Sequence, residues 1–133
     1  MRHRAHEGNN GSGDTQHRDP RITLERFRGE VKILLDGVAL ASSSQALVLR
    51  ESGYAPVYYF PRGDVQRALL VRTGHSTYCP HKGHASYWTI NSGEKAMENA
   101  AWSYESPYDG VLAIKGCIAF HGHGLDIQLV EAQ

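Results

Sequence analysis

The chain has 133 residues, enough for one domain, and its 14 Lys and Arg balance its 14 Asp and Glu. A net charge of zero argues against a partner such as nucleic acid, because a protein that binds the phosphate backbone needs a basic surface. No apolar run reaches the roughly 18 residues of a membrane-spanning helix. No apolar segment follows the N-terminal Met-Arg-His-Arg either, so no secretory signal is indicated. We therefore expect a cytoplasmic protein with no membrane partner and with two reduced cysteines.

The first twenty residues are rich in Gly, Asn, Ser, Asp, His and Arg and have no apolar periodicity. A segment of this composition buries too little apolar surface to offset the entropy lost when it becomes ordered. The sequence therefore predicts a disordered N-terminal tail at residues 1–20 and a single β-rich domain at residues 21–133.

From residue 22 onward, short β-type runs alternate with turn signals. Asp36-Gly37 suits the type I′ turn of a tight hairpin, and Asp64 is suited to cap a short helix at 64–70. Further strands are expected at 46–49 and 57–60. Three pairs of runs predict hairpins: 31–35 with 38–40, 85–90 with 96–104, and 114–120 with 125–130.

Many short strands with at most one short helix predict an all-β fold. We expect a compact antiparallel single domain, either barrel-like or built from two sheets.

Residues 77–88, Thr-Tyr-Cys-Pro-His-Lys-Gly-His-Ala-Ser-Tyr-Trp, combine a thiol, an amine, two imidazoles and large aromatic rings. Pro80 and Gly83 interrupt the segment, so it should turn and present its side chains. Cys79 is a candidate nucleophile, and Lys82 is a candidate catalytic or ligand-facing cation. The alternatives are a small buried thiol at Cys79 and an ordinary surface lysine at 82.

This segment resembles the central signature of the bacterial domain-of-unknown-function family 427, at Thr77, Cys79-Pro80, Lys82-Gly83 and 86–88. Further blocks match in the same order at 49–61, 98–107 and 114–120. The family carries a nucleotidyltransferase label, but the resemblance implies no established substrate. Nucleotidyl transfer needs clustered carboxylates that hold two Mg²⁺ ions. The chain has no Asp-x-Asp pair, so this activity ranks below a binding function.

Aromatic residues in polar company predict a pocket for a small molecule, since such pockets combine apolar walls with a few polar groups. An aromatic core is the alternative for any one ring, and a structural ion pair is the alternative for each charge. The candidate ligand-binding residues, including two charges that match the family, are Arg50, Tyr59, Trp88, Trp102, Tyr104 and Lys115.

Two groups of Cys and His residues invite comparison with zinc sites, which use thiolates and imidazoles. Their spacings, Cys-x-His-x-x-His and Cys-x3-His-x-His, are not usual for structural zinc, so we expect no metal site. The residues concerned are Cys79, His81, His84, Cys117, His121 and His123.

The sequence therefore predicts a small-molecule-binding domain, with a pocket flanked by Cys79 and Lys82 and walled by Tyr59, Trp88 and Trp102. Two alternatives remain, a cysteine-dependent transferase or hydrolase and a nucleotidyltransferase. No cofactor, ligand identity or oligomeric state is indicated.

Overall fold

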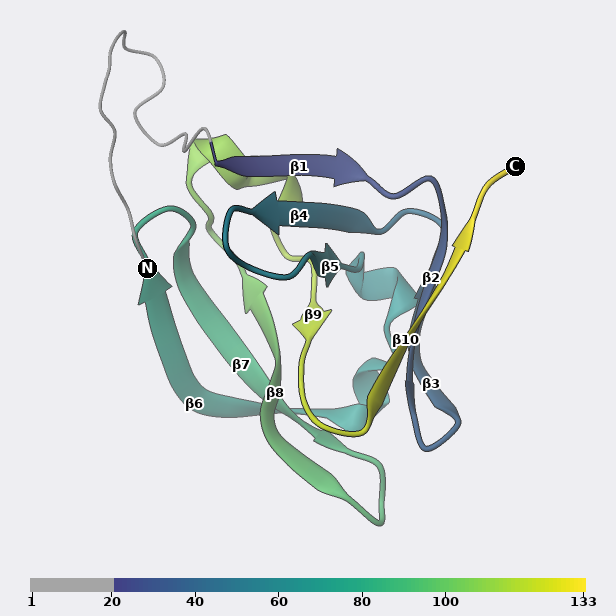
Figure 1. Ribbon diagram of the computed structural model, residues 1–133. Coiled ribbons are helices and arrows are strands. Elements are labelled where there is room, and N and C mark those ends of the chain that lie inside the picture. Colours follow the sequence, from purple (N-terminus) through teal and green to yellow (C-terminus); the bar gives the residue numbers. More distant parts are fainter. Residues whose placement is uncertain (1–20) are drawn as a thin grey trace, which may run out of the picture.

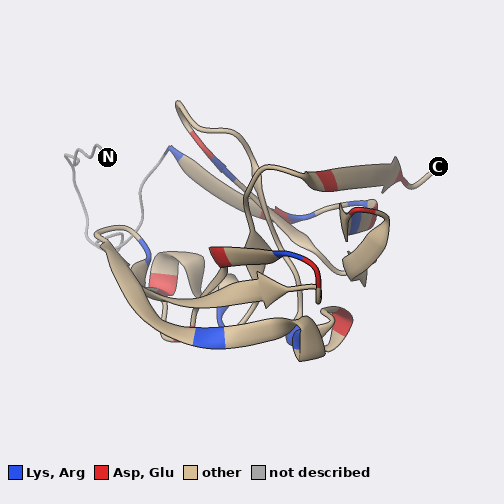
Figure 2. Ribbon diagram, turned by 90° about the horizontal axis from the view of Figure 1, so that it is seen from below, with Lys and Arg blue, Asp and Glu red and all other residues tan. Residues whose placement is uncertain are grey.

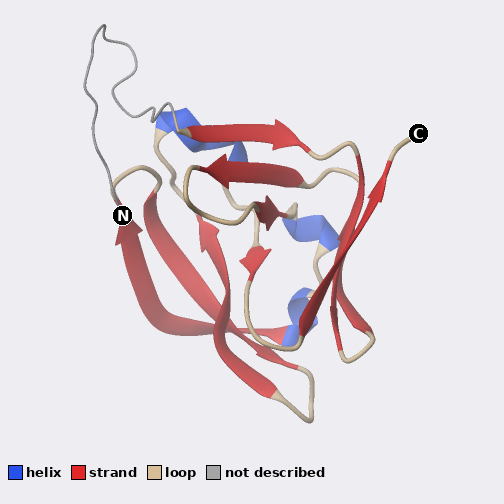
Figure 3. Ribbon diagram, viewed as in Figure 1, coloured by secondary structure: helices blue, strands red, loops and turns tan. Residues whose placement is uncertain are grey.

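The computed structural model describes residues 21–133, and the predicted N-terminal tail at 1–20 lies outside the described residues. The described part of the chain consists of strands joined by loops and short 3₁₀ helices (Figures 1 and 3). The three helices are η1 (Arg62–Asp64), η2 (Arg67–Leu69) and η3 (Asp109–Ile114). The all-β prediction is therefore confirmed.

The strands form three antiparallel sheets that do not close into a barrel. The first sheet has the order β1 (Ile22–Arg26), β4 (Leu47–Glu51) and β5 (Val57–Tyr59). The second has the order β10 (Leu125–Glu131), β2 (Gly29–Leu35) and β3 (Val38–Ser43). The third has the order β6 (Leu70–Cys79), β7 (Gly83–Asn91), β8 (Ala96–Tyr104) and β9 (Ala119–Phe120).

Two of the predicted hairpins are confirmed. Strands β2 and β3 meet at Asp36-Gly37, where φ is 51° and 82°. These positive values are those of a type I′ turn, which Asp-Gly accommodates. Strands β7 and β8 form the second hairpin across the predicted turn.

The third predicted hairpin is wrong. Its first half, 114–120, contains only the last residue of η3, a connecting loop and the short strand β9. Strand β9 pairs with β8, whereas β10 pairs with β2 in another sheet. The segment 121–124 therefore carries the chain from one sheet to the next. A run of apolar residues indicates a strand but does not identify its partner, which explains the error.

The segment 64–70 also differs from the predicted capped helix. It contains only the end of η1, the turn η2 and the first residue of β6. The Asp64 carboxylate caps no helix; it accepts a hydrogen bond from the Ser43 hydroxyl at 2.6 Å. Asp64 therefore ties this segment to strand β3.

The first and third sheets are joined where Phe60 and Ile118 exchange backbone hydrogen bonds, both 2.8 Å long. Both side chains are fully buried, so the joint lies inside the molecule. It brings β5 next to β9, near the centre of Figure 1.

Each face of the third sheet packs against a different hydrophobic cluster. Because side chains alternate along a strand, Tyr87 of β7 and its partner Trp102 of β8 share one face. Trp88 and its partner Ala101 share the other. Trp102 packs with the cluster of Tyr59 and Tyr104, and Trp88 with that of Phe60 and Phe120. The sheet therefore separates two environments.

Basic and acidic positions are interspersed along the strands (Figure 2). None of the helices in the described part of the chain has the length and apolar character needed to cross a membrane.

Candidate functional site

A pocket of about 350 Å³ lies where strands β4 and β5 of the first sheet meet the Tyr87–Trp102 face of the third sheet. Apolar and aromatic side chains provide most of its walls, together with one lysine, one glutamate and one histidine. The lining residues are Leu49, Glu51, Tyr54, Ala55, Val57, Tyr59, Lys82, Tyr87, Trp102, Tyr104 and His121.

The turn between β6 and β7 holds Lys82 in place. The Lys82 backbone N–H donates to the Cys79 carbonyl at 3.1 Å, and its carbonyl accepts from Tyr108 at 3.0 Å. Gly83 has φ of +113°, and a Cβ there would lie 3.3 Å from the Ser106 carbonyl oxygen. Glycine fits this crowded, left-handed position better than any other residue. The turn therefore fixes the backbone on both sides of Lys82.

The Lys82 ammonium connects two other groups at this site. Its Nζ lies 3.1 Å from Glu51 Oε1 and 3.6 Å from Cys79 Sγ. The Lys82 and Glu51 side chains are only 11% and 10% exposed. A buried charge is tolerated when it is paired and hydrogen-bonded, so the lysine and the glutamate depend on each other.

Two buried phenols form the inner wall. The Trp102 indole N–H donates to the Tyr59 hydroxyl at 3.4 Å, and the two rings meet edge to face at 6.4 Å. Burial raises the pKa of Tyr59 and the pKa of Tyr104 well above the usual value of 10. Both hydroxyls therefore stay protonated at neutral pH and can donate hydrogen bonds.

His121 closes another side of the pocket. Its ring lies 5.3 Å from that of Trp102, and its Nε2 lies 3.2 Å from the Asn99 carbonyl oxygen. A carbonyl only accepts, so Nε2 is the donor in this contact. Asn99 itself has φ of 53°, near the irregularity in the β7–β8 register.

Four of the predicted site residues, Tyr59, Lys82, Trp102 and Tyr104, line this pocket. Cys79 does not line it, but this half-buried thiol contacts Lys82 and packs against the cluster around Tyr59.

Three predicted ligand-binding residues lie outside the pocket. Trp88 is 8% exposed on the opposite face of the sheet. Arg50 pairs with Glu25 at 2.9 Å, with both side chains largely exposed. Lys115 is an exposed residue that follows η3.

Sequence reasoning did not select Glu51, Tyr54, Tyr87 or His121 as pocket residues. Strand alternation could have found Glu51, since Leu49 and Glu51 share a face of β4 and Arg50 takes the other. The sequence motif presents His121 only as a possible metal ligand. Its approach to Trp102 depends on the path of the chain after β9, which no local pattern indicates.

Within residues 21–133 the fold brings together no group of three or more His, Cys, Asp and Glu side chains that could hold a metal ion. The absence of a metal site stays a prediction for the whole chain.

No curated protein matches the chain at a significant level. A family model does match, over residues 23–131, and so covers nearly all of the described domain. The family is described as a domain of unknown function, under a label that suggests nucleotidyl transfer. The chain is thus a member of the DUF427 family.

Proposed function

We propose that this domain binds a small, uncharged molecule with a planar ring in the pocket between β4, β5 and the third sheet. The observation that carries the proposal is the composition of the pocket walls: aromatic rings, some of them edge to face, line a pocket whose one lysine and one glutamate are paired with each other. Pockets with apolar walls and a few placed polar groups are typical of small-molecule sites.

The charge inside the pocket favours an uncharged ligand. Lys82 is the one Lys or Arg among the lining residues, and Glu51 is the one carboxylate. A phosphate would have to compete with Glu51 for Lys82, at a distance of 3.1 Å. Two-metal nucleotidyl transfer needs several clustered carboxylates, and the lining offers one. The pocket therefore supports ring binding better than the reaction suggested by the family label.

Hydrogen bonding favours a ligand with a carbonyl or another acceptor. The Tyr59 hydroxyl accepts a hydrogen bond from the Trp102 indole N–H, so the Tyr59 O–H can donate to a different acceptor. Tyr104 is kept neutral by burial and has the same capacity. The ring would contact Trp102, while its acceptor atom would accept a hydrogen bond from the hydroxyl of Tyr59 or Tyr104.

Three one-ring probes of different charge test this function: benzamide, benzoate and benzylammonium. We expect benzamide to bind most tightly, with a Kd of about 1 mM, as expected for a ligand of its size. Binding should shift the Trp102 indole N–H in ¹H–¹⁵N NMR spectra. Tyr104→Phe should weaken benzamide binding about fivefold, the size of one lost neutral hydrogen bond.

The matched control is Tyr78→Phe, since Tyr78 is 53% exposed and is not a lining residue. It should leave benzamide binding unchanged. Tighter binding of benzoate than of benzamide would contradict an uncharged ligand. NMR shifts centred on the Trp88 indole N–H, and not on that of Trp102, would contradict the proposed location of the binding site.

A second candidate function, a cysteine-dependent transferase or hydrolase, is favoured by one contact. Lys82 Nζ lies 3.6 Å from Cys79 Sγ, and a nearby cation stabilises the thiolate form that attacks an electrophilic carbon. Glu51 orients the lysine from its other side. The arrangement is that of a nucleophile, its charged partner and an orienting carboxylate.

We expect iodoacetamide to label Cys79 at least about tenfold faster than Cys117 at pH 8. Cys117 is an internal control because it is also half-buried, and burial raises its pKa more than Arg62 lowers it. The double variant Glu51→Gln/Lys82→Met, which removes the ammonium without leaving a buried charge, should slow labelling of Cys79 alone. Equal rates at the two thiols, measured by mass spectrometry, would contradict an activated Cys79.

A further inference from the structure

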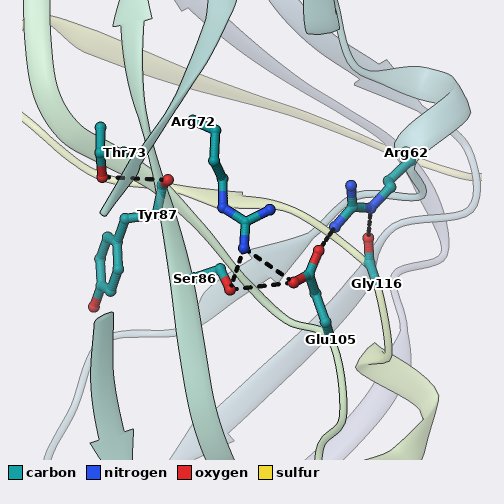
Figure 4. A network of polar contacts seen from close by, with 7 residues as sticks. All are labelled: Arg62, Arg72, Thr73, Ser86, Tyr87, Glu105 and Gly116. Carbon is teal, nitrogen blue, oxygen red and sulfur yellow. Dashed lines mark hydrogen bonds and ion pairs between the residues drawn. The ribbon is translucent and has the colours of Figure 1, made fainter. Parts of the chain in front are cut away.

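On the opposite face of the third sheet, three side chains from distant parts of the chain converge on the carboxylate of Glu105. Arg62 Nη2 donates to Glu105 Oε2 at 2.8 Å, and Arg72 Nη2 lies 3.4 Å from Glu105 Oε1. The Ser86 hydroxyl donates to the same Oε1 at 3.1 Å. Figure 4 shows the two guanidinium groups on either side of the Glu105 carboxylate. Arg62, Arg72, Ser86 and Glu105 are called the arginine cluster below.

The arginine cluster carries an excess of positive charge, because two guanidinium groups face one carboxylate. Both guanidinium carbons also lie over the Trp88 ring, 5.2 Å and 5.0 Å from its centre. Trp88 is 8% exposed, so an apolar wall backs the cluster. Such a wall reduces solvent screening and strengthens the attraction of the cluster for an anion.

The cluster also has more donors than acceptors. Each guanidinium has five N–H donors. Within the described residues, Arg62 uses Nε toward the Gly116 carbonyl and Nη2 toward Glu105. Arg72 uses Nη2 toward Ser86 and Glu105. Donors on Nη1 of both residues, and on Nε of Arg72, are therefore left for another acceptor, whereas both oxygens of Glu105 are occupied.

A buried hydroxyl lies next to the cluster. Ser103 is the strand partner of Ser86 and shares its face of the sheet. It is 0% exposed, and its hydroxyl has no hydrogen-bond partner among residues 21–133. Buried polar groups nearly always have a partner. Ser103 is thus a second, independent sign that this face has unused capacity for hydrogen bonding.

We propose that the arginine cluster binds an oxyanion, the carboxylate or phosphate group of a small molecule, through Arg72 and Arg62. This site lies across the sheet from the aromatic pocket and goes beyond the function proposed there. Arg72 is 54% exposed, so it can reach a ligand from solvent, and a guanidinium holds a carboxylate or phosphate through paired N–H bonds. Glu105 occupies part of the cluster and competes with the anion.

Titrations with sodium phosphate and sodium acetate, each against sodium chloride at equal ionic strength, test the proposal. The readouts are the NMR signals of the Trp88 indole N–H and of the arginine Nε–H groups. Saturable shifts at these positions with phosphate or acetate, but not with chloride, are expected. Tighter binding of phosphate would identify a phosphate ester as the ligand class, and tighter binding of acetate a carboxylate. Equal shifts with chloride would overturn the proposal.

Variants separate a binding site from a purely structural ion network. Arg72→Gln should weaken binding of the preferred anion about tenfold, the size of one lost charge-assisted hydrogen bond. Glu105→Gln should tighten it by a similar factor, because the competing carboxylate is removed. A structural network alone predicts no gain for Glu105→Gln, so unchanged or weaker binding there would also overturn the proposal.

Arg50→Gln is the matched control for this series. Arg50 also pairs with a glutamate at 2.9 Å, and the pair lies on the exposed surface of the first sheet. The variant should leave anion binding unchanged. A loss equal to that of Arg72→Gln would show that only the net charge of the protein matters, which contradicts a site.

Discussion

Replacing Glu51 with Gln is expected to lower the free energy of unfolding by about 3–5 kcal/mol. The substitution keeps the shape of the side chain but leaves the Lys82 ammonium buried without its carboxylate. Glu51 and Lys82 are 10% and 11% exposed and lie 3.1 Å apart, so little solvent can replace the lost partner. The melting temperature should fall by more than about 10 °C, which thermal unfolding monitored by circular dichroism will measure.

The neighbouring residue provides the control for this prediction. Arg50 is paired with Glu25, but these side chains are 49% and 67% exposed, and exposed pairs contribute less than about 1 kcal/mol. Arg50→Gln should therefore change stability little. The double variant Glu51→Gln/Lys82→Met should recover most of the loss, since no buried charge remains. If Glu51→Gln destabilised the protein as little as Arg50→Gln, the Glu51–Lys82 pair would be solvated. The argument that this pair makes the pocket unfavourable for a charged ligand would then fail.

The parts of the fold that local sequence predicted are those set by turn chemistry. Asp36-Gly37 fixed the first hairpin because both residues accept positive φ. The second hairpin followed from two strand-like runs around a short polar turn. The pairing of β9 with β8 and of β10 with β2 depends on contacts between distant segments, so no local pattern could show it.

The site was predicted where one short segment contains its residues, and missed where the fold assembles it. Lys82 and Cys79 belong to one turn, so the sequence places them together. Glu51 lies 31 residues before Lys82 and meets it only because β4 packs against the third sheet. Trp88 and Trp102 were assigned to one wall, but the register pairs Trp102 with Tyr87, which puts the two tryptophans on opposite faces. The cytoplasmic location and the absence of a nucleic-acid or membrane partner stay predictions.

High pH is expected to destabilise the domain through Tyr59 and Tyr104. Burial raises the pKa of both phenols above the usual value of 10, so above pH 10 the unfolded chain loses protons that the folded chain retains. The unfolded state then binds fewer protons, and stability falls as pH rises. Below pH 10 both phenols are protonated in the folded and in the unfolded chain. The full stability contribution of the two tyrosines is therefore present there and does not change with pH. Well above pH 10, each tyrosine should lower the free energy of unfolding by about 1.4 kcal/mol per pH unit.

Urea unfolding between pH 9 and 11.5, followed by circular dichroism, measures this slope. Tyr59→Phe and Tyr104→Phe should each remove about half of the part due to the two phenols, and the double variant should remove all of it. Comparison between variants cancels the contribution of the lysines, which titrate in the same range. Tyr54→Phe is the control, because Tyr54 is 55% exposed and should leave the slope unchanged. If the double variant kept the slope of the parent protein, the two phenols would ionise as readily in the folded as in the unfolded chain. They would then be too well solvated to form the dry inner wall on which the proposed recognition of an uncharged ring depends.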